Sequence, residues 1–134
     1  MFNFEANTTY DDKAKLRFHN AARKALRQVA IALQLQPGEY DLRSNKAGPA
    51  VSGEITLHGE SIYIQVSQSC MGPRCGILIR SCNGRRDYTG GHNNFMPLNA
   101  LHTPSAIAAL ARKLMPESDH DAELAGINSV ADLI

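Results

Sequence analysis

Two short segments with the same alternating pattern make up residues 51–66, which read VSGEITLHGESIYIQV. A period of two is typical of a strand that packs one face against a core. The tripeptide His-Gly-Glu at 58–60 separates the segments and predicts a tight turn. The residues that alternate with polar neighbours are Val51, Gly53, Ile55 and Leu57, then Ile62, Ile64 and Val66. We therefore expect the two segments to pair as an antiparallel hairpin.

The strand pattern continues on both sides of this hairpin. Residues 77–79, Ile-Leu-Ile, form a third apolar run, and Met-Gly-Pro at 71–73 predicts the turn before it. Residues 40–43, Tyr-Asp-Leu-Arg, can add a strand at one edge. Because consecutive strands usually lie side by side, an antiparallel meander is the economical arrangement.

A long helix is expected over residues 11–35, before the sheet. Asp11 and Asp12 complement the positive end of this helix, and the Pro-Gly pair at 37–38 ends it. Apolar residues follow three- and four-residue steps on one helical face: Phe18, Ala22, Ala25, Leu26, Val29 and Leu33. The pattern indicates an amphipathic helix that covers the sheet.

A second helix is expected near the other end of the chain. Thr103 predicts its N-cap, Pro104 suits its first position, and Pro116 stops it. Its apolar face carries Ile107, Leu110, Ala111 and Leu114. A further short helix is a candidate in residues 117–134, whose apolar side chains need a surface to cover.

The length and composition of the chain fit one domain spanning residues 1–134. The chain is 43% hydrophobic and 20% charged, which is far from the composition of disordered proteins. It holds no apolar run of about 18 residues, and its first residues, MFNFE, lack the pattern of a signal peptide. We expect a cytoplasmic α+β domain with a meander sheet, a long N-terminal helix and a C-terminal helix.

Three cysteines, Cys70, Cys75 and Cys82, crowd into one segment. An odd number favours free thiols in a reducing cytoplasm over a disulfide framework. With His92 they could form a zinc site, but the usual paired spacing of about two to four residues is missing. We therefore expect packed thiols, no metal and no cofactor.

The most unusual stretch is residues 80–95, which read RSCNGRRDYTGGHNNF, and we name its part from Cys82 to Phe95 the glycine-arginine loop. Its adjacent arginines, Arg85 and Arg86, offer forked donors for phosphate. Gly90 and Gly91 allow positive φ angles and a close approach of the backbone to a ligand. These features favour the binding of an anion.

The remaining side chains of the glycine-arginine loop suit a nucleoside. Asp87 can accept from ribose hydroxyls, and Asn93 and Asn94 can read the edge of a base. Tyr88 and Phe95 offer flat faces for stacking, which is worth about 1 to 3 kcal/mol per base in nucleic-acid systems. Together these groups predict a site for a small nucleotide.

Other interpretations of this loop stay open. The glycines could only shape a long connection whose charges are solvated and whose aromatic rings anchor it to the core. The loop lacks the Lys-Ser/Thr ending of a P-loop and does not match a dinucleotide fingerprint. Arg112, on the polar side of the second helix, could reach a phosphate or only serve solubility. The net charge of +1 argues against long nucleic acid as a partner.

The long N-terminal helix, the hairpin around residues 51–68 and the glycine-arginine loop together resemble phage proteins of the first anti-Thoeris family. The resemblance covers about residues 41–115 and rests chiefly on the loop. It implies a sponge, which captures a cyclic ADP-ribose isomer made by a bacterial TIR-domain enzyme and does not cleave it. It also implies a homodimer or larger homo-oligomer, with cyclic oligonucleotides bound at a separate site in some members.

The same resemblance implies a role for each residue of the site. Arg85 and Arg86 would pair with the pyrophosphate, and Asp87 with ribose. Phe95 or Tyr88 would stack on adenine, Asn93 or Asn94 would bond its edge, and Arg112 would close the pocket. High affinity and slow release suit a preorganised pocket without an acid-base pair, so no enzyme activity is expected. The alternative is a small phage-type inhibitor whose loop docks onto a host defence protein.

Overall fold

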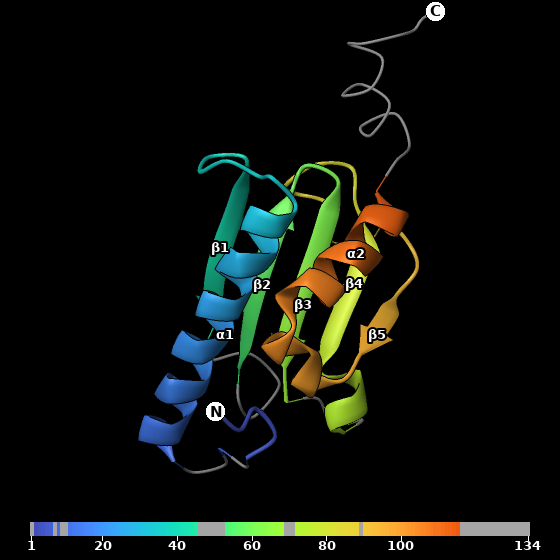
Figure 1. Ribbon diagram of the computed structural model, residues 1–134. Coiled ribbons are helices and arrows are strands. Elements are labelled where there is room, and N and C mark those ends of the chain that lie inside the picture. The colour runs from blue at the N-terminus through green and yellow to red at the C-terminus, as the bar shows by residue number, and fades with distance from the viewer. Residues whose placement is uncertain are drawn as a thin grey trace, which may run out of the picture.

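The computed structural model describes residues 2–6, 8, 11–45, 53–68, 72–88 and 90–115. Its strands form one antiparallel sheet in the order β1-β2-β3-β4-β5. These strands are β1 (Tyr40–Asn45), β2 (Glu54–Gly59), β3 (Ile62–Ser67), β4 (Ile77–Ser81) and β5 (Asn94–Met96). Two helices, α1 (Asp12–Ala32) and α2 (Pro104–Leu114), cover one face of the sheet (Figure 1). The expected α+β meander flanked by two helices is confirmed.

Helix α1 begins as its sequence predicts. The Asp11 carboxylate accepts a hydrogen bond from the backbone N–H of Ala14 at 3.0 Å, which satisfies one of the helix's unpaired donors and stabilises its end by about 1 kcal/mol. All six residues of the predicted apolar face are buried: Phe18, Ala22, Ala25, Leu26, Val29 and Leu33.

The predicted end of this helix at residue 35 is wrong, because α1 stops at Ala32. Gln34 adopts a left-handed conformation with φ of 61°, and the N–H of Leu35 reaches back to the carbonyl of Ala30 at 2.9 Å. The N–H of Gln34 bonds the carbonyl of Ile31 in the same way. This pair of bonds is a Schellman motif, which usually needs glycine at the left-handed position. A glutamine there gave no sequence signal.

The hairpin forms as predicted from Glu54 onward, with Leu57 opposite Ile64 and Ile55 opposite Val66, whereas Gly53 precedes β2 and Val51 lies outside the described residues. Its turn lies later than expected, however. Strand β2 continues through His58 and Gly59, so residues 60–61 alone connect it to β3. Strand β1 confirms the expected edge strand.

Strand β5 lies at the end of the segment for which the sequence predicts a loop. It consists of three residues and pairs with β4, with Phe95 opposite Leu78. Its sequence, Asn-Phe-Met, carries no alternating pattern, and its pairing depends on a partner strand that precedes the whole glycine-arginine loop.

The core lies between the sheet and the two helices. Fully buried side chains from three strands, such as Leu57, Ile64 and Ile79, meet Leu26 of α1 and Ile107 of α2. Each such side chain stabilises the fold by about 1.5 to 3 kcal/mol through removal of apolar surface from water. One core therefore unites the described residues.

Helix α2 has the predicted bounds, and Ile107 and Ala111 are buried on it. Thr103 stands at its N-cap, but the Thr103 side chain makes no capping hydrogen bond. A five-residue 3-10 helix, Leu98–His102, leads into α2 and buries Leu98 and Leu101. The helix expected in residues 117–134 lies outside the described residues. Within the described part of the chain, neither helix is both long and apolar enough to cross a membrane.

Candidate ligand-binding site

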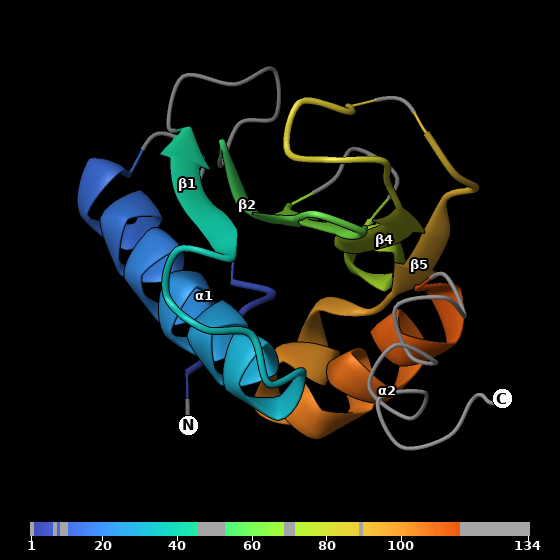
Figure 2. The same ribbon diagram turned by 90° about the horizontal axis from the view of Figure 1, so that it is seen from above.

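The face of the sheet opposite the helices, here named the outer face, lies beneath the glycine-arginine loop. Figure 2 shows the helices on one side of the sheet and the chain between β4 and β5 on the other. The strand register gathers on the outer face every second residue of each strand. These residues include Arg43 (β1), Thr56 and His58 (β2), Tyr63 and Gln65 (β3), Leu78 and Arg80 (β4), and Phe95 (β5).

Three rings form an aromatic cluster on the outer face. His58 and Tyr63 are cross-strand partners with ring centroids 5.0 Å apart and an interplanar angle of 89°. Tyr88, from the glycine-arginine loop, approaches His58 edge-to-face at 5.2 Å. His58 and Tyr63 are buried, whereas Tyr88 is 53% exposed. Tyr88 is therefore the member of this cluster that a ligand can reach.

Two guanidinium groups flank these rings. The Arg80 guanidinium lies over the Tyr63 ring, with its carbon 4.4 Å from the centroid, and the Arg43 guanidinium lies 5.8 Å from the Tyr88 centroid. Arg80 also donates to the Asn93 side chain at 3.4 Å and to the carbonyl of Tyr88. Its buried Nε has no hydrogen-bond partner among the described residues. Arg43 pairs with Asp41 at 3.2 Å and is 40% exposed.

The Asp87 carboxylate holds the glycine-arginine loop in shape. One of its oxygens accepts from the backbone N–H of Asn83 and the other from the backbone N–H of Gly90, each at 2.9 Å. The loop closes back onto the β2–β3 turn, because the N–H of Gly84 donates to the carbonyl of Glu60 at 2.7 Å. Asp87, predicted as a ribose acceptor, thus has an internal role in this structure.

Gly91 is required where the loop passes β4. Its φ is 78°, and a Cβ built there would lie 2.6 Å from the carbonyl oxygen of Ser81. A side chain would therefore strain the backbone and collide with the strand. Gly90 packs similarly against the Asp87 carboxylate. Gly91 therefore allows the loop to lie close to the sheet, and Gly90 allows the Asp87 carboxylate to approach its own loop.

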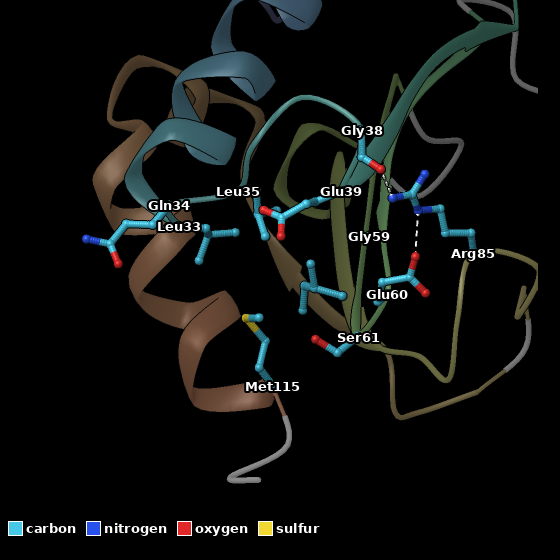
Figure 3. A pocket seen from close by; sticks show the side chains of 11 residues that line it. Leu33, Gln34, Leu35, Gly38, Glu39, Gly59, Glu60, Ser61, Arg85 and Met115 are labelled. Carbon is cyan, nitrogen blue, oxygen red and sulfur yellow. Dashed lines mark hydrogen bonds and ion pairs between the residues drawn. The ribbon is translucent and has the colours of Figure 1, made fainter. Parts of the chain in front are cut away.

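Arg85, predicted to pair with pyrophosphate, lies at one end of the sheet. Its Nε is 2.9 Å from Glu60 and its Nη1 is 3.5 Å from Asp41, and it donates to the carbonyl of Gly38. It borders a cavity of about 410 Å³ between the end of α1 and the β2–β3 turn (Figure 3). The cavity is also lined by apolar residues such as Leu35 and Ile62, by Gln34 and Ser61, and by the carboxylates of Glu39 and Glu60.

The other predicted site residues divide into three groups. Arg86, Asn93 and Phe95 are exposed, and Phe95 is so to 41%. Asn94 is half-buried and donates to the carbonyl of His92 at 3.0 Å, which orders the start of β5. Arg112 lies on α2, on the helical side of the sheet, and donates to the carbonyl of Ala32 at the end of α1. The structure thus brings Tyr88, Asn93 and Phe95 to the outer face and leaves Arg112 on the opposite side.

The thiols are placed as packed side chains. The Cys82 thiol donates to the carbonyl of Gly59 at 3.5 Å, and burial raises its pKa, so the thiol form is favoured. Cys75 is a half-buried free thiol. Within the described residues, no group of three His, Cys, Asp or Glu side chains could hold a metal ion. Cys70 lies outside that part of the chain.

Sequence reasoning missed Arg43, His58, Tyr63 and Arg80 as members of the site. The signal that could have found them is the same alternation that predicts the strands. If Ile55 and Leu57 face the core, then Thr56 and His58 face the opposite side. Pairing the hairpin would then have placed Tyr63 beside His58.

The outer face therefore combines exposed rings, guanidinium groups and an amide around one loop. Such a surface can stack a planar group and bind an anion. No protein-family model, curated protein or solved structure matches this chain.

Proposed function

We propose that this chain binds a small anionic nucleotide on its outer face and holds it without cleaving it. The observation that supports this most is that the Arg43 guanidinium lies beside the exposed ring of Tyr88, while Arg80 donates to the Tyr88 carbonyl. A base can stack on Tyr88 or Phe95, while the guanidinium groups bind phosphate oxygens. Each base stacked on an aromatic ring contributes about 1 to 3 kcal/mol in nucleic-acid complexes.

The hydrogen-bonding state of Arg80 favours an anionic ligand beside it. Its Nε is a buried donor without a partner among the described residues. Leaving such a donor unpaired costs about 1 to 3 kcal/mol, which a phosphate oxygen would recover only by displacing the atoms that cover Nε. A cation would gain nothing from this group.

The cavity beside Arg85 suits an anion less well than the outer face. Glu39 and Glu60 both line it, and Arg85 is already paired with Glu60 and Asp41. An incoming phosphate would meet repulsion from these carboxylates and would have to displace one of them from Arg85. We therefore place the proposed nucleotide on the outer face.

The burial and the hydrogen bonds of His58 and Cys82 favour binding without turnover. Both ring nitrogens of His58 lie within hydrogen-bond distance of protein atoms, and the ring is buried. The Cys82 thiol is buried and has a raised pKa. Neither group is placed to act as a general base or a nucleophile.

The resemblance extends this proposal to a specific ligand and context. It makes the ligand a cyclic ADP-ribose isomer, captured in the bacterial cytoplasm by a phage-type homo-oligomer that works stoichiometrically. Direct binding of a host defence protein is the alternative, for which exposed Tyr88 and Phe95 would serve as anchors.

Calorimetric titration with cyclic ADP-ribose isomers and cyclic oligonucleotides tests the proposal, followed by chromatography of the ligand released by heat. We expect tight binding of a cyclic ADP-ribose isomer and recovery of the intact ligand. Altered ligand would show an enzyme. Absence of binding to every nucleotide would refute the proposal and favour the protein inhibitor. In that case, the wild-type protein should capture a host defence protein, and the Tyr88→Ala variant should not.

A further inference from the structure

His58 lies wholly inside the protein, between β2 and the glycine-arginine loop, with 0% of its surface exposed. Its Nε2 is 3.0 Å from the carbonyl oxygen of Gly84. Its Nδ1 is 3.0 Å from Nη2 of Arg43. The imidazole therefore joins strand β1 to the loop across the sheet.

The two partners of His58 determine where its proton sits. A carbonyl oxygen can only accept, so Nε2 must carry a hydrogen and donate it to Gly84. A guanidinium can only donate, so Nδ1 must offer its lone pair to Arg43. Only the neutral Nε2–H tautomer satisfies both contacts. In the imidazolium form, Nδ1–H would point at the guanidinium of Arg43.

Both contacts hold parts of the proposed site. Gly84 is where the loop turns over the sheet, and its carbonyl also accepts from the N–H of Asp87 at 3.2 Å. The ring of Tyr88 packs against His58, and the guanidinium of Arg43 lies beside Tyr88. Protonation of His58 would keep the Nε2–H bond to Gly84, but it would set Nδ1–H against the Arg43 guanidinium and place a buried charge beneath Tyr88.

We propose that neutral His58 is the positioning residue of the outer face, and that its protonation releases Arg43 and opens the glycine-arginine loop, because the closed loop keeps water from the charged ring. His58 touches no ligand in this scheme, because it is buried beneath Tyr88. It acts through the residues that it holds.

Charged groups on β1 and in the glycine-arginine loop face His58. Arg43 on β1 opposes protonation, whereas Asp41 on β1 and Asp87 in the loop favour it. The rings of Tyr63 on β3 and Tyr88 in the loop also pack against His58. Burial raises the pKa of Tyr63, so its phenol stays neutral. Burial is the largest influence and lowers the pKa of His58 below 6.5, with the Gly84 contact opposing it.

The sign and size of the pH effect follow from these states. The closed loop excludes the proton, whereas an open loop exposes a histidine that titrates near 6.5. Closure is therefore complete above that pH and is lost as the pH falls. Between pH 7.5 and 5.5 the closed-to-open ratio should decrease by at most about tenfold, the value reached when the closed loop takes up no proton.

Two measurements without any ligand test this inference. Nitrogen chemical shifts of the His58 ring at pH 7.5 should report the Nε2–H tautomer. Hydrogen exchange of the loop amides of Asn83, Gly84 and Gly90, corrected for the intrinsic pH dependence of exchange, should show less protection at pH 5.5, by up to about tenfold. The Nδ1–H tautomer, or protection that is equal at both pH values, would overturn the proposal.

A matched pair of variants separates His58 from general acid effects. In His58→Gln, the amide oxygen can accept from Arg43 and the amide N–H₂ can donate to Gly84, but the group does not titrate. Loop protection in this variant should be independent of pH from 7.5 to 5.5. His92→Gln, at an exposed position, should keep the wild-type pH dependence. Persistence of the pH effect in His58→Gln would contradict the assignment.

The consequence for binding rests on the proposed function. Affinity for a cyclic ADP-ribose isomer should fall by up to about tenfold from pH 7.5 to 5.5 in the wild type and stay constant in His58→Gln. A simple charge effect has the opposite sign, because an added positive charge would strengthen the binding of an anion. If no nucleotide binds at either pH, the proposed function fails, while the ligand-free measurements still decide the role of His58.

Discussion

Replacing Asp87 with Asn should open the glycine-arginine loop while the sheet stays folded. The Asp87 carboxylate accepts from two backbone N–H groups at 2.9 Å, one from Asn83 and one from Gly90. An Asn side chain has one oxygen, so its N–H₂ group would face the other donor. One hydrogen bond to a charged group is then lost.

The size of this effect can be worked from the contacts. A hydrogen bond to a charged group contributes about 1.5 to 3 kcal/mol to stability. At about 1.4 kcal/mol per factor of ten, the loop should open roughly 10 to 100 times more often. Because the loop packs on the outer face and not in the core, the helices and central strands should keep their stability.

Amide hydrogen exchange measures both parts of this prediction. Protection of the Asn83 and Gly90 amides should fall roughly 10- to 100-fold in Asp87→Asn. Protection of Ile64 and Ile79, in the central strands, should not change. Asp12→Asn, at an exposed position of α1, removes the same charge and should leave the loop as it is. Unchanged loop protection in Asp87→Asn would refute the role of the carboxylate.

The further predictions concern substitutions of single residues. Tyr88→Ala should weaken nucleotide binding by about 1 to 3 kcal/mol in calorimetry, whereas Tyr88→Phe, which keeps the ring, should bind as the wild type does. An equal loss of affinity in both variants would argue against stacking. Gly91→Ala should lower the free energy of unfolding measured in urea by about 1 to 3 kcal/mol. Gly84→Ala, whose added Cβ meets nothing within 4 Å, should lower it by less. A larger loss in Gly84→Ala would contradict the close approach of Gly91 to Ser81. Arg85→Ala should cost up to about 1 kcal/mol of stability, because its ion pairs are partly exposed. Arg86→Ala should leave stability intact and lower the affinity for an anionic ligand about tenfold. An unchanged affinity would remove Arg86 from the site.

The elements that the sequence predicted well are those with a repeating pattern. The apolar face of α1 and the alternation of β2 and β3 each repeat over several turns or residue pairs, so burial on one side imposes the structure. Strand β5 was missed because three residues carry no period, and its pairing with β4 is formed across the whole loop. The end of α1 was misplaced because a glutamine occupies the left-handed position at which glycine is usual.

The site was predicted less well than the fold, for a physical reason. The loop's composition identified Tyr88, Asn93 and Phe95, which the structure brings to the outer face. Composition could not show that Asp87 bonds its own loop or that Arg85 meets Asp41 and Glu60, because such contacts form only after the chain folds. His58 was assigned to a turn, which hid its place on the outer face.

The central claim is that a nucleotide binds on the outer face, beside Tyr88. Its most direct test is to titrate isotope-labelled protein with a cyclic ADP-ribose isomer and follow the resonances of individual residues by NMR. The account predicts the largest shifts at Tyr88, Phe95 and the Arg80 side chain, with little change at Leu35 and Ile62 in the cavity beside Arg85. Shifts confined to that cavity, or no shifts at saturating ligand, would contradict it.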